Sequence, residues 1–496
     1  MSSPRWGVGL GIWGLGFSCI LFVLLATANA AGYRYGTSDQ AFYIPAVVRA
    51  LQPSAFPRDA ALIDSQGRLM LADDLIAGIM RTTGIPLDVL FLAGFLLSLL
   101  LIWVAITMIG RRLYVSTWAT AALAAAFTLR HRIPRTSANS FEPYFHPRML
   151  AFACGALAIA ALLRRRFWLA IALVGVSAAV HVTTALWFGV LIGVALVFLD
   201  RRFRGLAIAS MTATAAFLAW AATSGMLRDA FAVMDSTWLA AVAGKDSLFA
   251  SDWPAWAWVA NLSLLAIAWL AHSARRRHGT STDEERAILW GATALVVLFL
   301  ATFPLVLARI ALPVQLQISR VFWIVDFVTL MCVIGLARSE RAVRTVAALL
   351  IGVACVRGVY VMAVEHPERP LFAMHLPATE WEEAARWLKS QPSDIHVLAD
   401  PGHAWKYGTS IRVAAERDVF LEDVKDSAVA IYSRDVAVRF AERAPLVAGF
   451  DQMTAGRTHD LARRYDLDYL VTEADLPLPL AHRNSRFRVY RLGTRD

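Results

Sequence analysis

Long apolar stretches separated by short polar ones occupy the first three quarters of the chain. A helix needs about 20 predominantly apolar residues to cross the roughly 30 Å hydrocarbon core of a bilayer, because each residue adds about 1.5 Å. We predict crossings near residues 8–30, 86–110, 113–129, 205–224, 254–272, 287–308, 317–337 and 343–364. This pattern predicts a polytopic α-helical membrane protein, since every backbone group inside the bilayer must be hydrogen-bonded internally.

The apolar region between Met149 and Leu199 is divided by three arginines, Arg164 to Arg166. The remaining stretch from Phe167 to Leu199 has 33 residues. A helix of that length measures about 50 Å, which is too long for one crossing and too short for two full ones. Because arginines flank the stretch on both sides, we predict two short helices that break near His181. With these, the chain has about eleven crossings.

The arginine clusters between the apolar stretches predict the orientation, because cytoplasmic loops of membrane proteins are enriched in Arg and Lys. Such clusters recur at residues 111–112, 164–166, 201–204, 275–277 and 338–344. With a cytoplasmic N-terminus, the outer side receives residues 31–85, 130–148, 225–253 and 309–316 and everything after about residue 365. Residues 28–30 look like a signal-peptidase site, but the preceding apolar run is longer than a usual signal core, so we expect a retained first helix.

Composition agrees with this class of protein. Hydrophobic residues make up 58% of the chain and charged residues only 17%. Soluble globular proteins average about 25% charged residues, so this composition argues against an ordinary soluble enzyme. The membrane topology accounts for the formal net charge of +10, so we expect no nucleic-acid partner. The four cysteines all lie in apolar runs, which supports neither a disulfide framework nor a zinc site.

Charged residues return in the last part of the chain, and the pattern predicts two domains, residues 1–364 in the membrane and residues 365–496 outside it. Trp381, Ala384, Ala385 and Leu388 recur at helical spacing after Thr379. Alternating residues predict strands at 394–400, 468–472 and 486–491. We therefore expect an α/β domain, and it carries no glycine-rich nucleotide motif.

An aspartate, Asp39, follows the first predicted helix by a few residues, in the segment Ser38-Asp39-Gln40-Ala41-Phe42-Tyr43-Ile44-Pro45. A carboxylate that is partly desolvated at the membrane surface can act as a general base or bind a cation. The alternative is that Ser38 or Asp39 caps a helix over residues 40–51, and spacing alone favours the cap.

The second predicted outer loop, residues 130–148, breaks the positive-inside trend with Arg132, Arg135, His146 and Arg148 around Glu142. Guanidinium groups bind phosphate oxygens bidentately and stay charged at physiological pH, so this loop is a candidate site for a lipid-linked phosphate. Contact with lipid headgroups, or pairing with Glu142, is an equally good interpretation.

Ionisable residues within the membrane domain are costly, and each is a candidate functional residue. His181 lies between the two short helices, and Arg320 lies near the outer end of its helix. For His181, a packing residue with satisfied hydrogen bonds is the slightly favoured interpretation. Asp326 lies deeper and could neutralise a buried arginine.

A long first outer loop with an acid after the first helix, short central helices, a late arginine and an outer soluble domain together resemble the GT-C glycosyltransferase superfamily. The segment from Ser38 to Pro45, continued by Leu51-Gln52-Pro53-Ser54-Ala55-Phe56-Pro57-Arg58-Asp59, is similar to uncharacterised bacterial members, including those of the DUF6798 type. The resemblance implies a multi-pass protein of the bacterial inner membrane whose site faces outward.

The same resemblance implies transfer of a sugar from a polyprenyl-phosphate donor, with Asp39 as the catalytic residue near an acceptor of unknown identity. By position, it makes Arg132, Arg135, His146, Arg148 and Arg320 candidate phosphate ligands. Glu142 and His181, from the same loop and the helix break, complete the set of candidate substrate-binding residues. Gln40 stands where some members have a second acid, so we expect no cofactor, although a divalent metal is not excluded. The alternatives are a flippase for an anionic lipid-linked intermediate and a non-catalytic membrane subunit with a binding domain.

Overall fold

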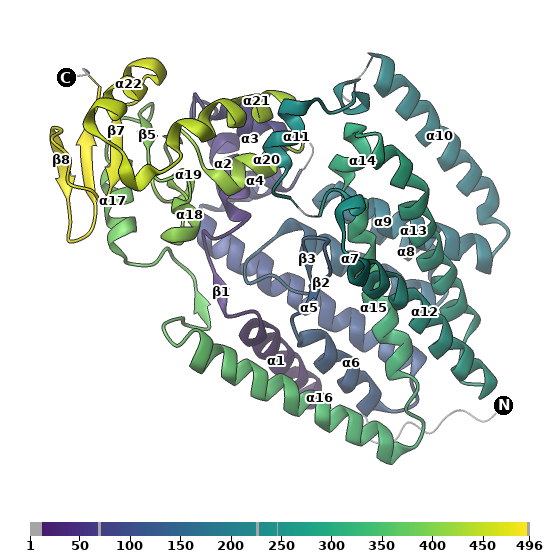
Figure 1. The fold of residues 1–496 in the computed structure, drawn as a ribbon. Coiled ribbons are helices and arrows are strands. Elements are labelled where there is room, and N and C mark those ends of the chain that lie inside the picture. The colour runs from purple at the N-terminus through teal and green to yellow at the C-terminus, as the bar shows by residue number, and fades with distance from the viewer. Residues whose placement is uncertain (1–11, 68–70, 225–227, 246, 494–496) are drawn as a thin grey trace.

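A computed structural model describes residues 12–67, 71–224, 228–245 and 247–493. Most of it is a bundle of helices, and a smaller α/β region lies at one end of the bundle (Figure 1). Among the described residues, seven helical segments are long and apolar enough to cross a membrane, and four shorter apolar helices accompany them. The chain is therefore mostly helical and has the features of a multi-pass membrane protein.

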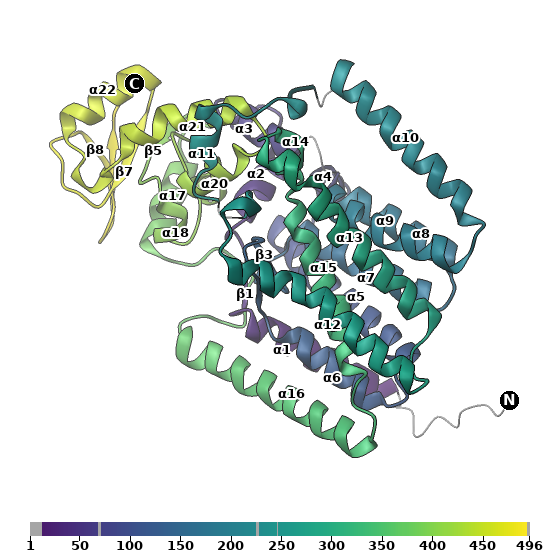
Figure 2. The same cartoon turned by 45° about the vertical axis from the view of Figure 1, so that its right-hand side comes forward.

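The apolar helices follow the predicted stretches closely. They are α1 (Ile12–Asn29), α5 (Leu87–Leu113), α6 (Thr117–Thr128), α7 (Pro147–Leu163), α8 (Phe167–Val180), α9 (Val182–Leu199), α10 (Phe203–Ser224), α12 (Ala255–Arg277), α13 (Asp283–Leu307), α15 (Val321–Ile334) and α16 (Glu340–Tyr360). Residues 8–11 of the first predicted crossing lie outside the described residues. In both views α10 and α16 lie along opposite sides of the bundle (Figure 2).

The predicted break near His181 is confirmed. Helix α8 ends at Val180 and α9 begins at Val182, and His181 between them has an extended backbone with φ −156° and ψ 101°. The His181 ring accepts a hydrogen bond from the Thr184 backbone N–H, so it caps the second helix.

The arginine clusters gather at one end of the bundle, which we call the arginine-rich end. Glu284 binds both Arg165, at 2.6 Å, and Arg112, at 3.5 Å, and so joins two clusters. Gly335, next to another cluster, packs against the Arg275 guanidinium. The aromatic contact of Phe167 with Phe203, at 5.6 Å between ring centroids, brings the 201–204 cluster next to the 164–166 cluster. This grouping is the arrangement that the positive-inside pattern predicts.

Helix α5 connects the arginine-rich end to the opposite end. Its last turn carries Arg112, whereas Phe91 in its first turns contacts Tyr35 and Phe145 of the predicted outer loops. The 27 residues of α5 span about 40 Å, which is enough to cross a bilayer.

Short helices cover the end opposite to the arginine-rich end. They are α2 (Gln40–Leu51), α3 (Ala60–Gly67), α4 (Ala72–Thr83), α11 (Ser236–Val242) and α14 (Ala311–Leu316), with 3₁₀ turns at η1 (Arg228–Phe231), η2 (Ala250–Asp252) and η3 (Ile318–Arg320). Phe56 and Trp238 from this layer form one apolar cluster with Val429 and Val436 of the C-terminal region. The C-terminal region is therefore packed against the bundle by shared apolar burial.

The C-terminal region contains a five-stranded mixed sheet with the order β6-β5-β7-β9-β8. Its strands are β5 (His396–Leu398), β6 (Asp418–Val419), β7 (Tyr469–Thr472), β8 (Leu480–Arg483) and β9 (Arg488–Arg491). Strands β6, β5 and β7 are parallel, and β9 is antiparallel to both β7 and β8. All three predicted strands are present, whereas β6 and β8 were not predicted, because β6 has two residues and β8 lacks an alternating apolar pattern.

The helices of this region begin with α17 (Glu380–Lys389), where the pattern after Thr379 predicts a helix, and the Thr379 side chain caps it. The others are α18 (His403–Lys406), α19 (Ile411–Ala414), α20 (Asp423–Val429), α21 (Arg434–Arg443) and α22 (Ala455–Tyr465), with η5 (Ala444–Val447) and η6 (Phe450–Gln452) between the last two. A π-helical turn, η4 (Val361–Glu365), ends α16.

Two small sheets connect predicted outer segments. The strand β1 (Tyr33–Arg34) pairs in parallel with β4 (Phe372–Ala373), which precedes the C-terminal sheet. The strands β2 (Arg132–Ile133) and β3 (Ala138–Asn139) form a short antiparallel hairpin. The segment between α1 and α2 is therefore hydrogen-bonded directly to the segment that leads into the C-terminal region.

Candidate functional site

A polar cavity of about 880 Å³ lies at the end of the bundle opposite to the arginine-rich end. Its walls come from the segment between α1 and α2, from the 130–148 loop, from the residues around η3 and from α20 of the C-terminal region. Two lining side chains are acids, Asp39 and Glu142. Eight are cations, namely Arg34, Arg130, Arg132, Arg148, Lys245, Arg320, Arg369 and Lys425. The cavity therefore favours an anionic ligand.

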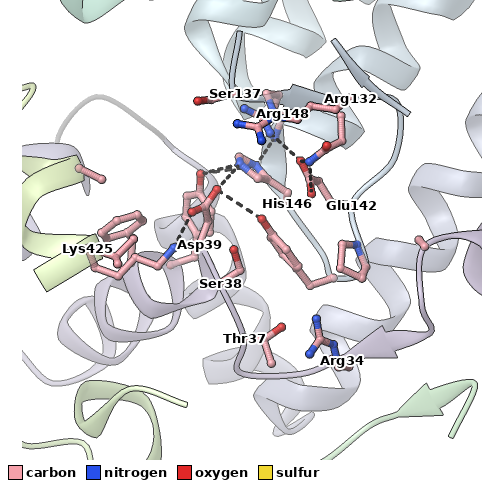
Figure 3. A pocket seen from close by; sticks show the side chains of 18 of the residues that line it. Arg34, Thr37, Ser38, Asp39, Arg132, Ser137, Glu142, His146, Arg148 and Lys425 are labelled. Atoms are coloured by element: carbon pink, nitrogen blue, oxygen red, sulfur yellow. Dashed lines mark hydrogen bonds and ion pairs between the residues drawn. The ribbon is translucent and has the colours of Figure 1, made fainter. Parts of the chain in front are cut away.

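Asp39 projects into this cavity between two regions of the chain (Figure 3). Its Oδ1 accepts a hydrogen bond from the Lys425 ammonium at 2.8 Å, and its Oδ2 lies 3.4 Å from both the His146 Nε2 and the Tyr144 hydroxyl. Asp39 occupies the N-cap position of α2 but makes no side-chain cap hydrogen bond. The capping interpretation of its side chain is therefore wrong, because the carboxylate binds distant residues instead.

The neighbouring Gln40 holds Asp39 against the second outer loop. Its amide donates to the Phe145 carbonyl oxygen at 3.2 Å, and its side-chain oxygen accepts from the Gly36 backbone N–H at 2.6 Å. Gly36 and Ser38 both have positive φ, of 80° and 55°, which allows the tight turn that places Asp39. The residue after Asp39 is therefore a structural link to His146.

His146 has a defined tautomer. Its Nδ1 accepts a hydrogen bond from the Arg148 backbone N–H at 3.1 Å and so caps α7. An accepting Nδ1 leaves the proton of a neutral ring on Nε2, the atom that faces Asp39. Burial and the charge of Arg148 lower the pKa of His146 to about 4, so the ring is neutral at physiological pH and donates to Asp39.

Opposing effects act on the pKa of Asp39. Burial raises it, but the Lys425 ammonium and the hydrogen bond from His146 outweigh burial and hold the pKa well below its usual range. Asp39 is therefore a carboxylate at physiological pH. Its Oδ1 is bound tightly, whereas the two long contacts at Oδ2 leave that oxygen available to another donor.

Glu142 pairs with arginines of its own loop. It binds Arg148 at 2.9 Å and Arg130 at 3.8 Å, and it accepts hydrogen bonds from the Asn139 amide at 3.2 Å. Burial raises the pKa of Glu142 despite these arginines. For Arg130 and Arg148 the pairing interpretation therefore holds, although Arg148 also lies 5.6 Å from the centre of the Trp323 ring and lines the cavity.

Arg132 and Arg320 line the cavity without an acid. Among the described residues neither side chain makes a hydrogen bond or an ion pair, and the Arg320 Nε is buried without a partner. A buried polar atom without a partner is costly, so the Arg320 Nε favours a ligand that supplies oxygen atoms. Arg135 lies in the turn of the β2–β3 hairpin with φ 55° and is not among the lining residues.

His181 lines the cavity 6.2 Å from His146 between ring centroids, and its Nδ1 also contacts the Thr184 hydroxyl at 3.0 Å. His181 therefore both caps α9 and lines the cavity.

Asp326 was expected to neutralise a buried arginine, and this expectation is wrong. Its ion-pair partner is His131, at 2.9 Å. In the described part of the chain, no three His, Cys, Asp or Glu side chains are grouped so as to hold a metal ion.

Lys425, Lys245 and Arg34 are lining residues that sequence reasoning missed. Lysine is rare in this chain, with four lysines against 44 arginines, and two of the four line the cavity. The rarity of lysine is therefore a feature of the sequence that could have pointed to Lys245 and Lys425 as candidate site residues. No spacing rule links Lys425 to Asp39, because 386 residues separate them.

The comparisons with known proteins add no relative. No protein-family model matches the chain, and a search among curated proteins finds no match. The function therefore has to be argued from the cavity.

Proposed function

We propose that this protein is a membrane-embedded glycosyltransferase of the GT-C type that takes a sugar from a polyprenyl-phosphate donor. The observation that carries the proposal is the carboxylate of Asp39 inside a cavity rich in cations. Among the described residues, four of these cations have no acid partner, namely Arg34, Arg132, Lys245 and Arg320. One ionised acid facing several free cations is what sugar transfer from a lipid phosphate requires.

In the proposed reaction, an acceptor hydroxyl approaches Oδ2 of Asp39 and attacks the anomeric carbon of the donor. The hydroxyl proton passes to Asp39 as the new glycosidic bond forms. The bond between the anomeric carbon and the phosphate oxygen breaks, and the lipid phosphate leaves with the electron pair. Arg320 and Arg132 stabilise the negative charge that develops on the leaving phosphate.

The topology that goes with this proposal has about eleven crossings, a cytoplasmic N-terminus and the cavity at the outer face of the bacterial inner membrane. The arginine-rich end supports this orientation, since its clusters lie at the end opposite to the cavity. The short helices α8 and α9 bring His181 to the cavity wall, which agrees with a helix break that lines a polar space.

The test is sugar transfer in proteoliposomes with a polyprenyl-phosphate sugar, read as release of polyprenyl phosphate. We expect Asp39→Asn to lower the rate by about 10²–10⁴-fold, the usual contribution of a general base. Asp64→Asn is the matched control, because Asp64 is an exposed acid in the same loop that pairs with Arg49. An equal rate for Asp39→Asn and wild type would refute the proposal.

The same assay separates the enzyme from its rivals. A flippase would move the donor across the bilayer with the sugar still attached. A binding subunit would neither transport the donor nor transfer its sugar. Intact donor in every wild-type reaction would therefore exclude the proposed transfer.

A further inference from the structure

The C-terminal region inserts one side chain into the cavity. Lys425 lies on α20, and its side chain is only 6% exposed. The ammonium donates to Asp39 Oδ1 at 2.8 Å and lies 5.1 Å from the centre of the Phe42 ring. Figure 3 shows it approaching Asp39 from the side away from His146. The candidate site is thus built from both parts of the chain.

A buried charge cluster fixes the position of α20. Arg412 donates to Asp426, the residue after Lys425, at 2.6 Å, and to Asp59 of the first outer loop at 2.8 Å. Arg439 of α21 also binds Asp59. We call Asp59, Arg412, Asp426 and Arg439 the docking cluster. Because it ties α20 to the loop that carries Asp39, the distance between Lys425 and Asp39 is set by the fold.

We propose that Lys425 is a positioning residue of the active site, which binds Oδ1 of Asp39 and leaves Oδ2 free for the acceptor hydroxyl. This inference rests on the proposed function for its catalytic meaning. It makes the C-terminal region part of the active site, since without Lys425 the carboxylate would face the cavity with no cation in direct contact.

Other groups around Asp39 do not substitute for this lysine. His146 is neutral, and Tyr144 and Tyr43 are hydroxyl groups in the same wall. Arg148 is bound to Glu142. The remaining charged neighbours are Arg320 and Lys245, and neither has a direct contact with the carboxylate. Burial opposes ionisation of Asp39, so loss of Lys425 is expected to protonate it at higher pH.

The test compares wild type with Lys425→Met, Lys425→Arg and Lys389→Met in the purified full-length protein. Lys389 is the control, since it lies in the same C-terminal region and pairs with Glu416 at the surface. A hydrophobic carbodiimide reacts with protonated carboxyl groups, and peptide mass spectrometry reports labelling of Asp39 at each pH. We expect the labelling midpoint to rise by about 1–3 pH units in Lys425→Met. Lys425→Arg and Lys389→Met are expected to stay near wild type.

Transfer rates in the same four proteins give the catalytic readout. We expect Lys425→Met to lower the rate at neutral pH by at least about tenfold, because the carboxylate loses its fixed orientation, and to move the acid limb of the pH profile upward. Lys425→Arg should recover most of the rate.

The outcomes separate the two proposals. Transfer that is absent even from wild type refutes the proposed function, whatever the labelling shows. Transfer by wild type, together with unchanged labelling or an unchanged pH profile in Lys425→Met, refutes the role of Lys425 alone.

Discussion

Arg412 in the docking cluster and Arg320 in the cavity wall differ in their partners. Arg412 in the docking cluster is 1% exposed and has carboxylates on two sides, from Asp59 and Asp426. The Arg320 side chain in the cavity has no hydrogen-bond or ion-pair partner among the described residues. All three nitrogens of the Arg412 guanidinium donate to carboxylates of the protein, whereas a partner for the Arg320 guanidinium has to come from a ligand.

The contrast separates a structural role from a binding role. A buried charge costs several kcal/mol unless a partner and hydrogen bonds compensate for it. Arg412 meets that condition through the protein itself, so it stabilises the contact between the C-terminal region and the first outer loop. Arg320 does not meet it, so its guanidinium is available to an anion.

The largest expected effect comes from breaking the docking cluster. Arg412→Met leaves Asp59 and Asp426 buried with less compensation and should lower the free energy of unfolding by about 3–5 kcal/mol. Denaturant unfolding of the detergent-solubilised protein measures this change. Arg434→Met is the control, because Arg434 binds Asp235 at 2.5 Å but is 55% exposed, and exposed pairs contribute about 0–1 kcal/mol. Equal losses in both variants would contradict the comparison.

The pH dependence of the free energy of unfolding tests the surroundings of the docking cluster. His396 lies near the docking cluster, and burial lowers its pKa from its usual value to about 4. The unfolded chain therefore binds a proton that the folded one does not, so this stabilisation is present above about pH 6.5 and is lost as the pH falls toward 4. For His396→Phe we expect the loss between pH 7 and pH 4 to be smaller by about 3 kcal/mol. Unfolding curves at both pH values measure it, and parallel pH profiles would speak against the assignment.

The apolar pattern predicts the helices well, because the length of each apolar run is a local property. It places α8 and α9 with their break at His181, and the arginine clusters predict which helix ends lie together. Thr379 likewise predicts the start of α17, because a side-chain cap involves residues only three apart.

The candidate site is predicted less completely, because it depends on contacts between distant residues. Asp39, Glu142, His146, Arg148, His181, Arg132 and Arg320 all line the cavity, as the loop assignments imply. Arg135 does not, since the hairpin turn after Arg132 carries it away from the lining. Lys425 was missed because its helix reaches Asp39 only through the docking cluster, which joins segments more than 350 residues apart.

The smallest expected effect concerns Arg320, the arginine in the cavity. Arg320→Met should weaken binding of a short-chain polyprenyl phosphate by about 10–100-fold, because a hydrogen bond to a charged group contributes about 1.5–3 kcal/mol. The free energy of unfolding without ligand should not fall, since the substitution removes a buried charge that no carboxylate pairs with. Calorimetric titration in detergent measures the affinity.

Arg309→Met is the matched control for the loss of one positive charge. Arg309 also has a buried guanidinium nitrogen without a partner, Nη1, but its guanidinium lies outside the cavity lining, 4.1 Å from the centre of the Phe249 ring. Its affinity for the lipid phosphate should stay within about twofold of wild type, since a charge outside the cavity is screened over about a Debye length. If Arg320→Met destabilised the protein as Arg412→Met does and left lipid-phosphate affinity unchanged, Arg320 would belong with the structural arginines. A buried charge without a partner would then mark no binding site in this protein.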